Sequence, residues 1–193
     1  MRDRIILGAA VALCAAFALA PQAGFAQSLP LSGPDFSGVN TMAEAASRDK
    51  TDQVTAMLLA GRHPDVTDDS GQTPLGYAAR FGDVQMARVL LQFHAPVDTR
   101  DPFGNTPLHW AAQQGNIEVI RMLLDAHASI DAQNKQGMTP LMMAVREGRV
   151  GAVQLLLRRG ASLTKQDYTG RDAFGWAEGK PNMLEILRLA KAG

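Results

Sequence analysis

Four histidines are the side chains of this sequence best suited to metal binding or acid–base chemistry. His94 and His127 differ by 33 in residue number, and the same step aligns them with Gly61 and Gly160. Glycine is common just after a helix, where the backbone turns left-handed, and histidine is among the few other residues enriched there. We therefore interpret these two histidines as residues that end helices. The complete set is His63, His94, His109 and His127.

A shared metal site is the alternative for these histidines. It requires His94 and His127, or one of them with His109, to converge on one metal ion or haem. Equivalent residues of packed helices lie about 8–10 Å apart, whereas a zinc ion holds each ligand at about 2 Å. The spacing therefore favours a structural role, and a histidine-based metal or haem handling protein stays as the alternative.

No other pattern of catalytic residues is present in the sequence. It contains no glycine-rich phosphate loop, no His-Glu-x-x-His and no Gly-x-Ser-x-Gly. Asp68, Asp101 and Asp167 recur at equivalent places and are typical of side chains that accept hydrogen bonds in turns. We predict no catalytic, cofactor-binding or metal-binding residues and no enzyme activity.

The first residues have the pattern of an export signal. Arg2 and Arg4 precede an almost unbroken apolar run from Ile5 to Ala20, which is shorter than the ~20 residues that cross a membrane comfortably. Small residues then stand at the positions that a signal peptidase requires. We predict that residues 1–26 are a signal peptide, cleaved after Ala26.

Cleavage would leave a protein without cysteine. The only cysteine is Cys14, and 17 basic and 18 acidic side chains would remain. Disulfides and thiol chemistry are then excluded, and the near-neutral charge gives no indication of nucleic-acid binding. A lipid anchor on Cys14, disfavoured by the bulky Leu13 before it, and an uncleaved signal anchor are the alternatives. We expect a bacterial periplasmic protein without stable membrane insertion after cleavage.

One sequence period organises the rest of the chain. Thr-Pro-Leu motifs begin at Thr73, Thr106 and Thr139, which gives a period of 33, and a glycine stands two places before each. Glycine permits the positive φ of a tight turn, threonine caps a helix, and proline fits its first turn. Each motif therefore predicts the start of a helix, which Gly82, Gly115 and Gly148 end in the second, third and fourth units.

A second helix is predicted to follow in each unit, because apolar residues recur there at helical spacing. In the third unit these residues are Ile117, Ile120, Leu123 and Leu124. Paired alanines on the first helix allow a neighbouring helix to approach closely. The pattern predicts an all-α stack of five units. A linker at 27–34 precedes units at 35–67, 68–100, 101–133, 134–166 and 167–193.

These residues together resemble the ankyrin repeat, which Asp101 to Gln133 match most fully. The resemblance implies an ankyrin-repeat solenoid in which His109, in the Thr-Pro-Leu-His motif, links neighbouring loops by hydrogen bonds. The outer units depart from the pattern: Asn40-Thr41-Met42 and Asp172-Ala173-Phe174 replace Thr-Pro-Leu. We interpret these two units as caps with a more polar outer face.

The resemblance also implies a binding groove for another protein, formed by the turn tips and the exposed side of the first helices. The positions on this side that vary between units are the candidate contacts. They are Asp69, Ser70, Gln72, Arg80 and Phe81 in the second unit, Pro102, Phe103, Asn105, Gln113 and Gln114 in the third, and Lys135, Gln136, Met138, Arg146 and Glu147 in the fourth.

One large residue per unit adds a row along the first helices. These side chains either pack between adjacent helices, the interpretation we favour, or line the groove as interface anchors. Phe81 and Phe103 are likewise either exposed to a partner or packed against the next turn. The row consists of Tyr77, Trp110, Met143 and Trp176.

Charge is unevenly distributed along the units. The first three together carry a net charge of −6, and the fourth carries +5. Such polarity would orient a partner or allow head-to-tail self-association. From the sequence we predict a non-catalytic interaction scaffold that binds or stabilises an exported partner, and the alternative besides metal handling is an effector secreted to act on host proteins.

Overall fold

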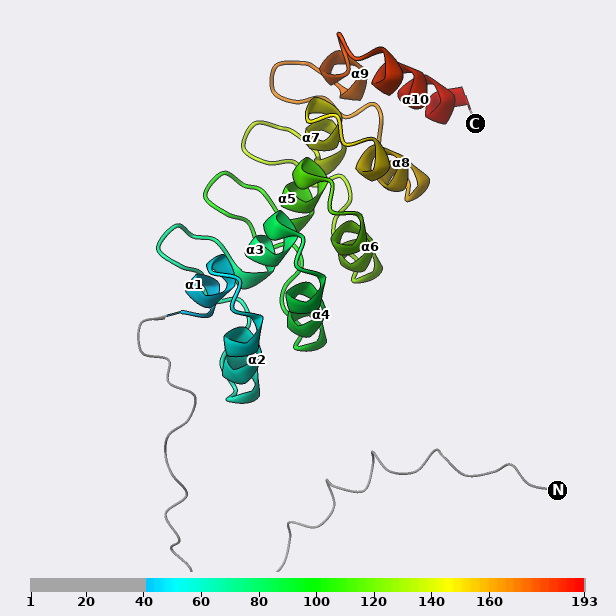
Figure 1. The fold of residues 1–193 in the computed structure, drawn as a ribbon. Helices are drawn as coiled ribbons and strands as arrows, with labels where there is room; N and C mark the ends of the chain where they lie inside the picture. The colour runs from blue at the N-terminus through cyan, green and yellow to red at the C-terminus, as the bar shows by residue number, and fades with distance from the viewer. Residues whose placement is uncertain (1–40, 193) are drawn as a thin grey trace, which may run out of the picture. The chain divides into compact units, whose positions relative to one another are not determined.

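The computed structural model describes residues 41–192. The predicted signal peptide, the linker and the start of the first unit lie outside the described residues. Within 41–192 the chain forms ten α-helices and no β-strand, arranged as five pairs (Figure 1). None of these helices is long and apolar enough to cross a membrane. The pairs are α1 (Met42–Ser47) with α2 (Thr51–Leu59), α3 (Pro74–Phe81) with α4 (Val84–Gln92), α5 (Pro107–Gln114) with α6 (Ile117–Asp125), α7 (Pro140–Arg146) with α8 (Val150–Arg158), and α9 (Ala173–Trp176) with α10 (Pro181–Ala192).

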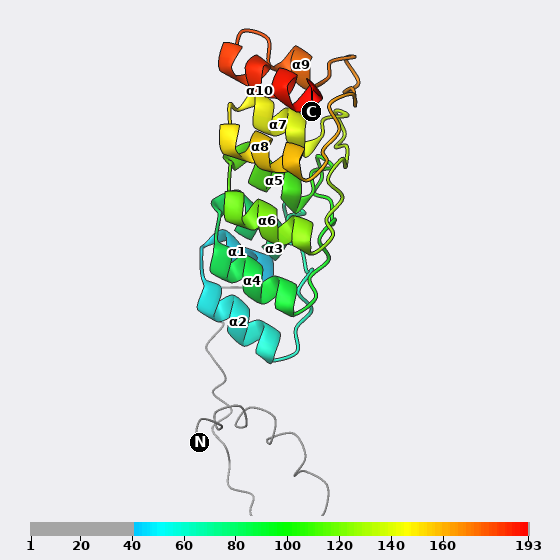
Figure 2. The ribbon, with the colours of Figure 1, turned by 90° about the vertical axis from the view of Figure 1, so that its right-hand side faces the viewer.

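The helices form two layers. The first helices of the pairs, α1, α3, α5, α7 and α9, make one layer, and the second helices make the other, which faces the viewer in Figure 2. The turns between units project beside the first helices (Figure 1). First helices of neighbouring units pack more closely than second helices do. The layer of first helices is therefore the inner side of the curved stack.

Side-chain caps begin the first helices at the predicted places. The hydroxyl of Thr73 accepts a hydrogen bond from the amide of Gly76 at 3.0 Å, and Thr139 caps α7 in the same way. In the first unit the cap is Thr41, one residue later than the spacing predicts for Asn40. Helix α1 is therefore shorter at its start.

Small and branched apolar residues fill the space between the units. Ala78 and Ala79 on α3 and Ala111 and Ala112 on α5 have no exposed surface, which allows these helices to lie close together. Leucines of the Thr-Pro-Leu motifs and of the second helices complete one continuous core. Burial of these side chains provides the main favourable free energy of folding.

The fifth unit, the last that the structure describes, carries charged residues on its outer face. Glu178 is exposed at the position that Ala112 and Val145 occupy, fully buried, in the two preceding units. Arg188 follows the buried Leu187 and is also exposed. The outer face of this unit is therefore polar, as a terminal repeat requires.

Candidate protein-binding surface

The turns that border the inner side share one hydrogen-bond pattern. In the second unit, Oδ1 of Asp68 accepts the amides of Ser70 and Gln72, both at 3.0 Å. Oδ1 of the equivalent residue accepts the same two amides in the three later turns, so the predicted turn-stabilising role of the aspartates is confirmed. These equivalent residues are Asp101, Asn134 and Asp167.

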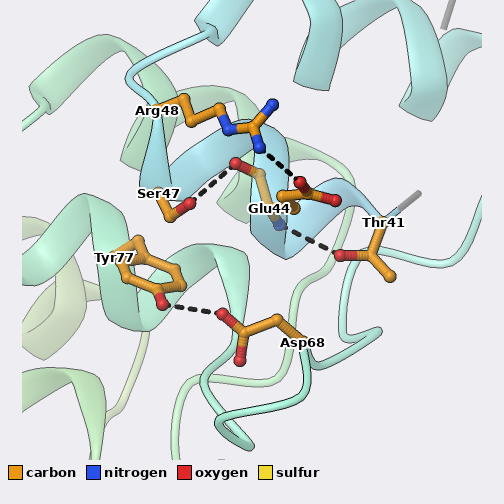
Figure 3. A network of polar contacts seen from close by, with 6 residues as sticks. All are labelled: Thr41, Glu44, Ser47, Arg48, Asp68 and Tyr77. Atoms are coloured by element: carbon orange, nitrogen blue, oxygen red, sulfur yellow. Dashed lines mark hydrogen bonds and ion pairs between the residues drawn. The ribbon is translucent and has the colours of Figure 1, made fainter. Parts of the chain in front are cut away.

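The second carboxylate oxygen of each aspartate holds the large residue nine positions later. Figure 3 shows this contact for the hydroxyl of Tyr77 and Asp68. The fourth unit has Met143 and Asn134 at these places, so it lacks both the donor and the charge, and Asn134 instead donates to Asn105 at 2.8 Å. The three bonded pairs are Tyr77–Asp68 at 2.7 Å, Trp110–Asp101 at 3.0 Å and Trp176–Asp167 at 3.0 Å.

These hydrogen bonds shift the pKa values of the partners. Burial alone would raise the pKa of Asp68, but the bonds from Ser70, Tyr77 and the backbone outweigh it and hold that pKa below its usual value. The pKa of Asp167 is lowered for the same reasons, by bonds that include the one from Trp176. The pKa of Tyr77 is raised by burial and by its bond to Asp68.

The row of large residues thus packs against the turns and stays partly accessible. Met143 is buried, with 4% of its surface exposed, in a cluster with Met138, Met142 and Trp176. The packing interpretation is confirmed for Met143. Tyr77 and the two tryptophans are half-buried, and each has one edge hydrogen-bonded to a turn.

Arginines from the preceding unit lie over both tryptophans. The guanidinium carbon of Arg80 is 5.0 Å from the ring centroid of Trp110, and that of Arg146 is 5.8 Å from the centroid of Trp176. Gln113 stands at the equivalent position before Met143. Arginine is thus present where the next unit offers an indole ring, which attracts a cation to its face. Sequence reasoning missed these contacts, although each arginine precedes its tryptophan by the same interval in the sequence.

Four predicted groove residues are not on the surface. Gln72, Asn105 and Met138 are 7%, 6% and 2% exposed, so their predicted exposure is wrong, and Met143 is buried as the favoured packing interpretation predicts. The first three stand directly after the turn glycine, where the amide bonds back to the aspartate or asparagine of the turn. This closes the turn and directs the side chain inward.

The two predicted phenylalanines are exposed. Phe103 at a turn tip is 67% exposed, and Phe81 at the end of α3 is 53% exposed although it stacks on Tyr77 with ring centroids 5.8 Å apart. We call the accessible part of the inner side the first-helix surface. It consists of Asp69, Ser70, Tyr77, Arg80, Phe81, Pro102, Phe103, Trp110, Gln113, Gln114, Lys135, Gln136, Arg146, Glu147 and Trp176.

Backbone hydrogen bonds join the turn tips of neighbouring units. The amide of Lys135 donates to the carbonyl of Phe103 at 3.0 Å, and the amide of Tyr168 donates to that of Gln136 at 3.1 Å. In the third unit, Pro102 stands at the position of Lys135 and Tyr168 and has no N–H, so it cannot make the same bond to the turn of the second unit. The tips of the third, fourth and fifth units are therefore fixed relative to one another.

A shallow depression of about 370 Å³ interrupts the first-helix surface between the first two units. Figure 3 shows polar side chains around it: the amide of Glu44 on α1 donates to the Thr41 cap, and the carboxylate of Glu44 pairs with Arg48 at 2.7 Å. The depression is lined by Thr41, Glu44, Asp68, Asp69, Ser70 and Tyr77.

His109 has the linking role that the resemblance implied. Its Nδ1 accepts the amide of Thr106 at 3.1 Å, which leaves Nε2 as the donor to the carbonyl of Met138 in the next unit at 3.0 Å. The ring is fully buried, and burial lowers the pKa of His109 to about 4. A neutral imidazole therefore serves as a structural link.

The other histidines lie apart from such a network. His94 and His127 have φ values of 58° and 63°, which confirms the predicted left-handed conformation after the second helix. His63 contacts the carboxylate of Asp65 on the surface. Nowhere in residues 41–192 do three histidine, cysteine or acidic side chains lie close enough together to hold a metal ion.

The described part of the chain is thus a helical-repeat solenoid with regular interunit links and an open inner surface. A family model described as ankyrin repeats (3 copies) matches residues 42–134, 96–167 and 126–192, and the chain belongs to the ankyrin-repeat family. A search of curated proteins finds no match to it. Ankyrin repeats generally mediate protein–protein interaction and are typically non-catalytic.

Proposed function

We propose that the chain is a non-catalytic scaffold that binds and stabilises or tethers an exported protein through its first-helix surface. The exposure of Phe103 and Phe81 carries this proposal. A ring that is more than half exposed adds little burial to the fold, whereas a rigid aromatic side chain at an interface contributes a large share of binding free energy.

The surface is also held in place before a partner binds. The hydrogen bond from Lys135 fixes the carbonyl of Phe103, and the turn beneath is closed by Asp101. A preorganised surface loses little conformational entropy on association, which leaves more of the contact free energy for affinity.

Export is the second part of the proposal, and the sequence supports it. Arg2 and Arg4, the apolar run after them and the small residues before position 27 are typical of a signal peptide. The absence of cysteine after residue 26 suits an oxidising compartment. We place the protein in the bacterial periplasm, where an accessory protein would meet envelope enzymes and other exported chains.

Affinity capture tests the proposal with the full chain carrying a C-terminal tag. A Phe81→Ser, Phe103→Ser variant removes the exposed rings, and Leu59→Ser, at 73% exposure on a second helix, removes a comparable apolar side chain elsewhere. We expect the parent and the Leu59 variant to retain one partner from envelope extract and the double variant to lose it while keeping its helical circular dichroism. Capture of the same proteins by all three would contradict binding at this surface.

Cell fractionation tests the location and separates it from the effector alternative. A processed protein in the periplasmic fraction is the expected result, and a processed protein found only in the culture medium would favour a secreted effector. The metal alternative has its own test: a change in thermal stability or absorption on adding zinc or haemin to metal-free protein would favour it.

A further inference from the structure

Two arginines converge on one indole ring near the C-terminal end of the inner side. The guanidinium carbons of Arg146 and Arg171 lie 5.8 and 4.3 Å from the ring centroid of Trp176. Stacking on an aromatic face holds a guanidinium in place while its edge stays available for hydrogen bonds. Trp176 therefore orients two cations toward the same region.

Much of the donor capacity of these arginines is unused within the described residues. Arg171 bonds through Nε to the hydroxyl of Thr169 at 3.1 Å and forms no ion pair with any carboxylate in residues 41–192. Arg146 uses Nε for Glu147 at 3.0 Å, and its Nη1 contacts the sulfur of Met138, a weak acceptor, at 3.5 Å. The remaining Nη groups are suited to a bidentate carboxylate.

A second stacked arginine lies two units away on the same side. Arg80 covers Trp110 with its guanidinium carbon 5.0 Å from the ring centroid. At about 8–10 Å between packed helices, Trp110 and Trp176 are roughly 16–20 Å apart. An extended chain rises about 3.3 Å per residue, so five or six residues of a bound segment would span that distance.

The part of the first-helix surface that the third unit contributes, between these cations, is uncharged. It presents the exposed ring of Phe103. The fourth unit, with its net charge of +5, adds Lys135 at the next turn tip. The charge of the surface thus suits a ligand that is acidic at both ends of a short segment and apolar between them.

On the basis of the proposed function, we propose that the first-helix surface binds an extended acidic segment of the partner protein. One carboxylate engages Arg80, a second about five or six residues away engages Arg146 and Arg171, and an apolar side chain between them contacts Phe103. The two tryptophans position the guanidinium groups and leave the carboxylates to provide specificity.

Selection from a displayed library of random 12-residue peptides on the full chain tests this proposal. We expect enriched peptides to carry Asp or Glu at two positions five or six residues apart, with a large apolar residue between them. An enriched peptide labelled with fluorescein then allows the dissociation constant to be measured by fluorescence anisotropy for each variant.

Arg146→Gln with Arg171→Gln is the test variant, since glutamine already stands at the equivalent position 113. Arg158→Gln with Arg188→Gln removes two exposed arginines from the second helices of the same units and is the matched control. We expect the test variant to bind the labelled peptide at least tenfold more weakly and the control to stay within twofold, because each charge-assisted hydrogen bond contributes strongly to affinity.

The outcomes separate this proposal from the one on which it rests. Enriched peptides without acidic residues, or equal affinity in the test and control variants, would overturn the acidic-segment proposal. In either case, loss of peptide binding in the Phe81→Ser, Phe103→Ser variant would still support an interaction scaffold that uses this surface. A library that yields no binder, or binders insensitive to both the arginine and the phenylalanine substitutions, would overturn both.

Discussion

His109 and Met138 are joined across two repeat units by a hydrogen bond of 3.0 Å between the imidazole Nε2 and a main-chain carbonyl oxygen. The same ring accepts the amide of Thr106, which begins α5. The bond from the Thr106 amide needs a neutral imidazole, because a protonated ring has no acceptor left, whereas Nε2 can donate to Met138 in either state. The buried ring can therefore keep both bonds only while it is neutral.

Acidification is expected to destabilise the fold through His109. Its pKa is about 4 in the folded chain and near the usual 6.5 in the unfolded chain, so between these values the unfolded chain alone binds the proton. The free energy of unfolding should then fall with falling pH by up to about 1.4 kcal/mol per pH unit. Urea unfolding at several pH values between 7.5 and 4 measures this slope.

A His109→Gln variant is the control for the pH experiment. It lacks the titrating group, so its stability should change less over the same range, and parallel curves for the two proteins would contradict the assignment. The pKa values of Asp68 and Asp167 are also lowered in the fold, so these carboxylates stabilise it above their usual pKa of 3.8 and lose that effect as the pH falls below it. The pH range in which they change stability therefore lies below the range in which His109 does.

The bond between Trp110 and Asp101 should be energetically coupled. Trp110→Met leaves Oδ2 of Asp101 without its indole donor, which should cost about 1–3 kcal/mol, and Asp101→Asn weakens the turn. The double variant recreates the Asn134 and Met143 pair of the fourth unit. Denaturant unfolding of the four proteins should show the double variant about 1 kcal/mol or more stable than additivity predicts, and strictly additive effects would refute the coupling.

Two glycines with similar backbone angles should differ in their tolerance of a side chain. Gly137 and Gly148 have φ values of 77° and 70°, so alanine is strained by about 1–2 kcal/mol at either site. A Cβ at Gly137 would also lie 2.7 Å from the amide nitrogen of Tyr168, whereas one at Gly148 meets nothing within 4 Å. Thermal unfolding should therefore show a markedly lower midpoint for Gly137→Ala than for Gly148→Ala. Equal midpoints would mean that the turn tips can move apart without cost.

The regular spacing of the Thr-Pro-Leu motifs was sufficient to predict the fold because the signals of each unit are local. A glycine with positive φ, a threonine cap and a proline act within a single turn of chain, and their repetition predicts the stack. The left-handed His94 and His127 follow from the same alignment. Thr41 departs from it, since the spacing cannot show that α1 begins one residue late.

The candidate surface was harder to predict because exposure depends on contacts between units. Asn105 looks like a variable turn residue, but a hydrogen bond from Asn134 in the next unit helps to bury it. The same applies to the arginines, since Arg80 meets Trp110 only after two units have stacked. Whether the surface residues bind a partner stays a prediction.

The charged end of the fifth unit has a consequence for the length of the array. A unit packed against the fifth would have to bury Glu178, which stands where Ala112 and Val145 are fully buried in the two preceding units. A copy of residues 101–133 inserted before the fourth unit would meet the fourth unit through the same apolar residues that the third unit uses now. Duplication in the interior of the array therefore buries less charge than addition of a unit against Glu178.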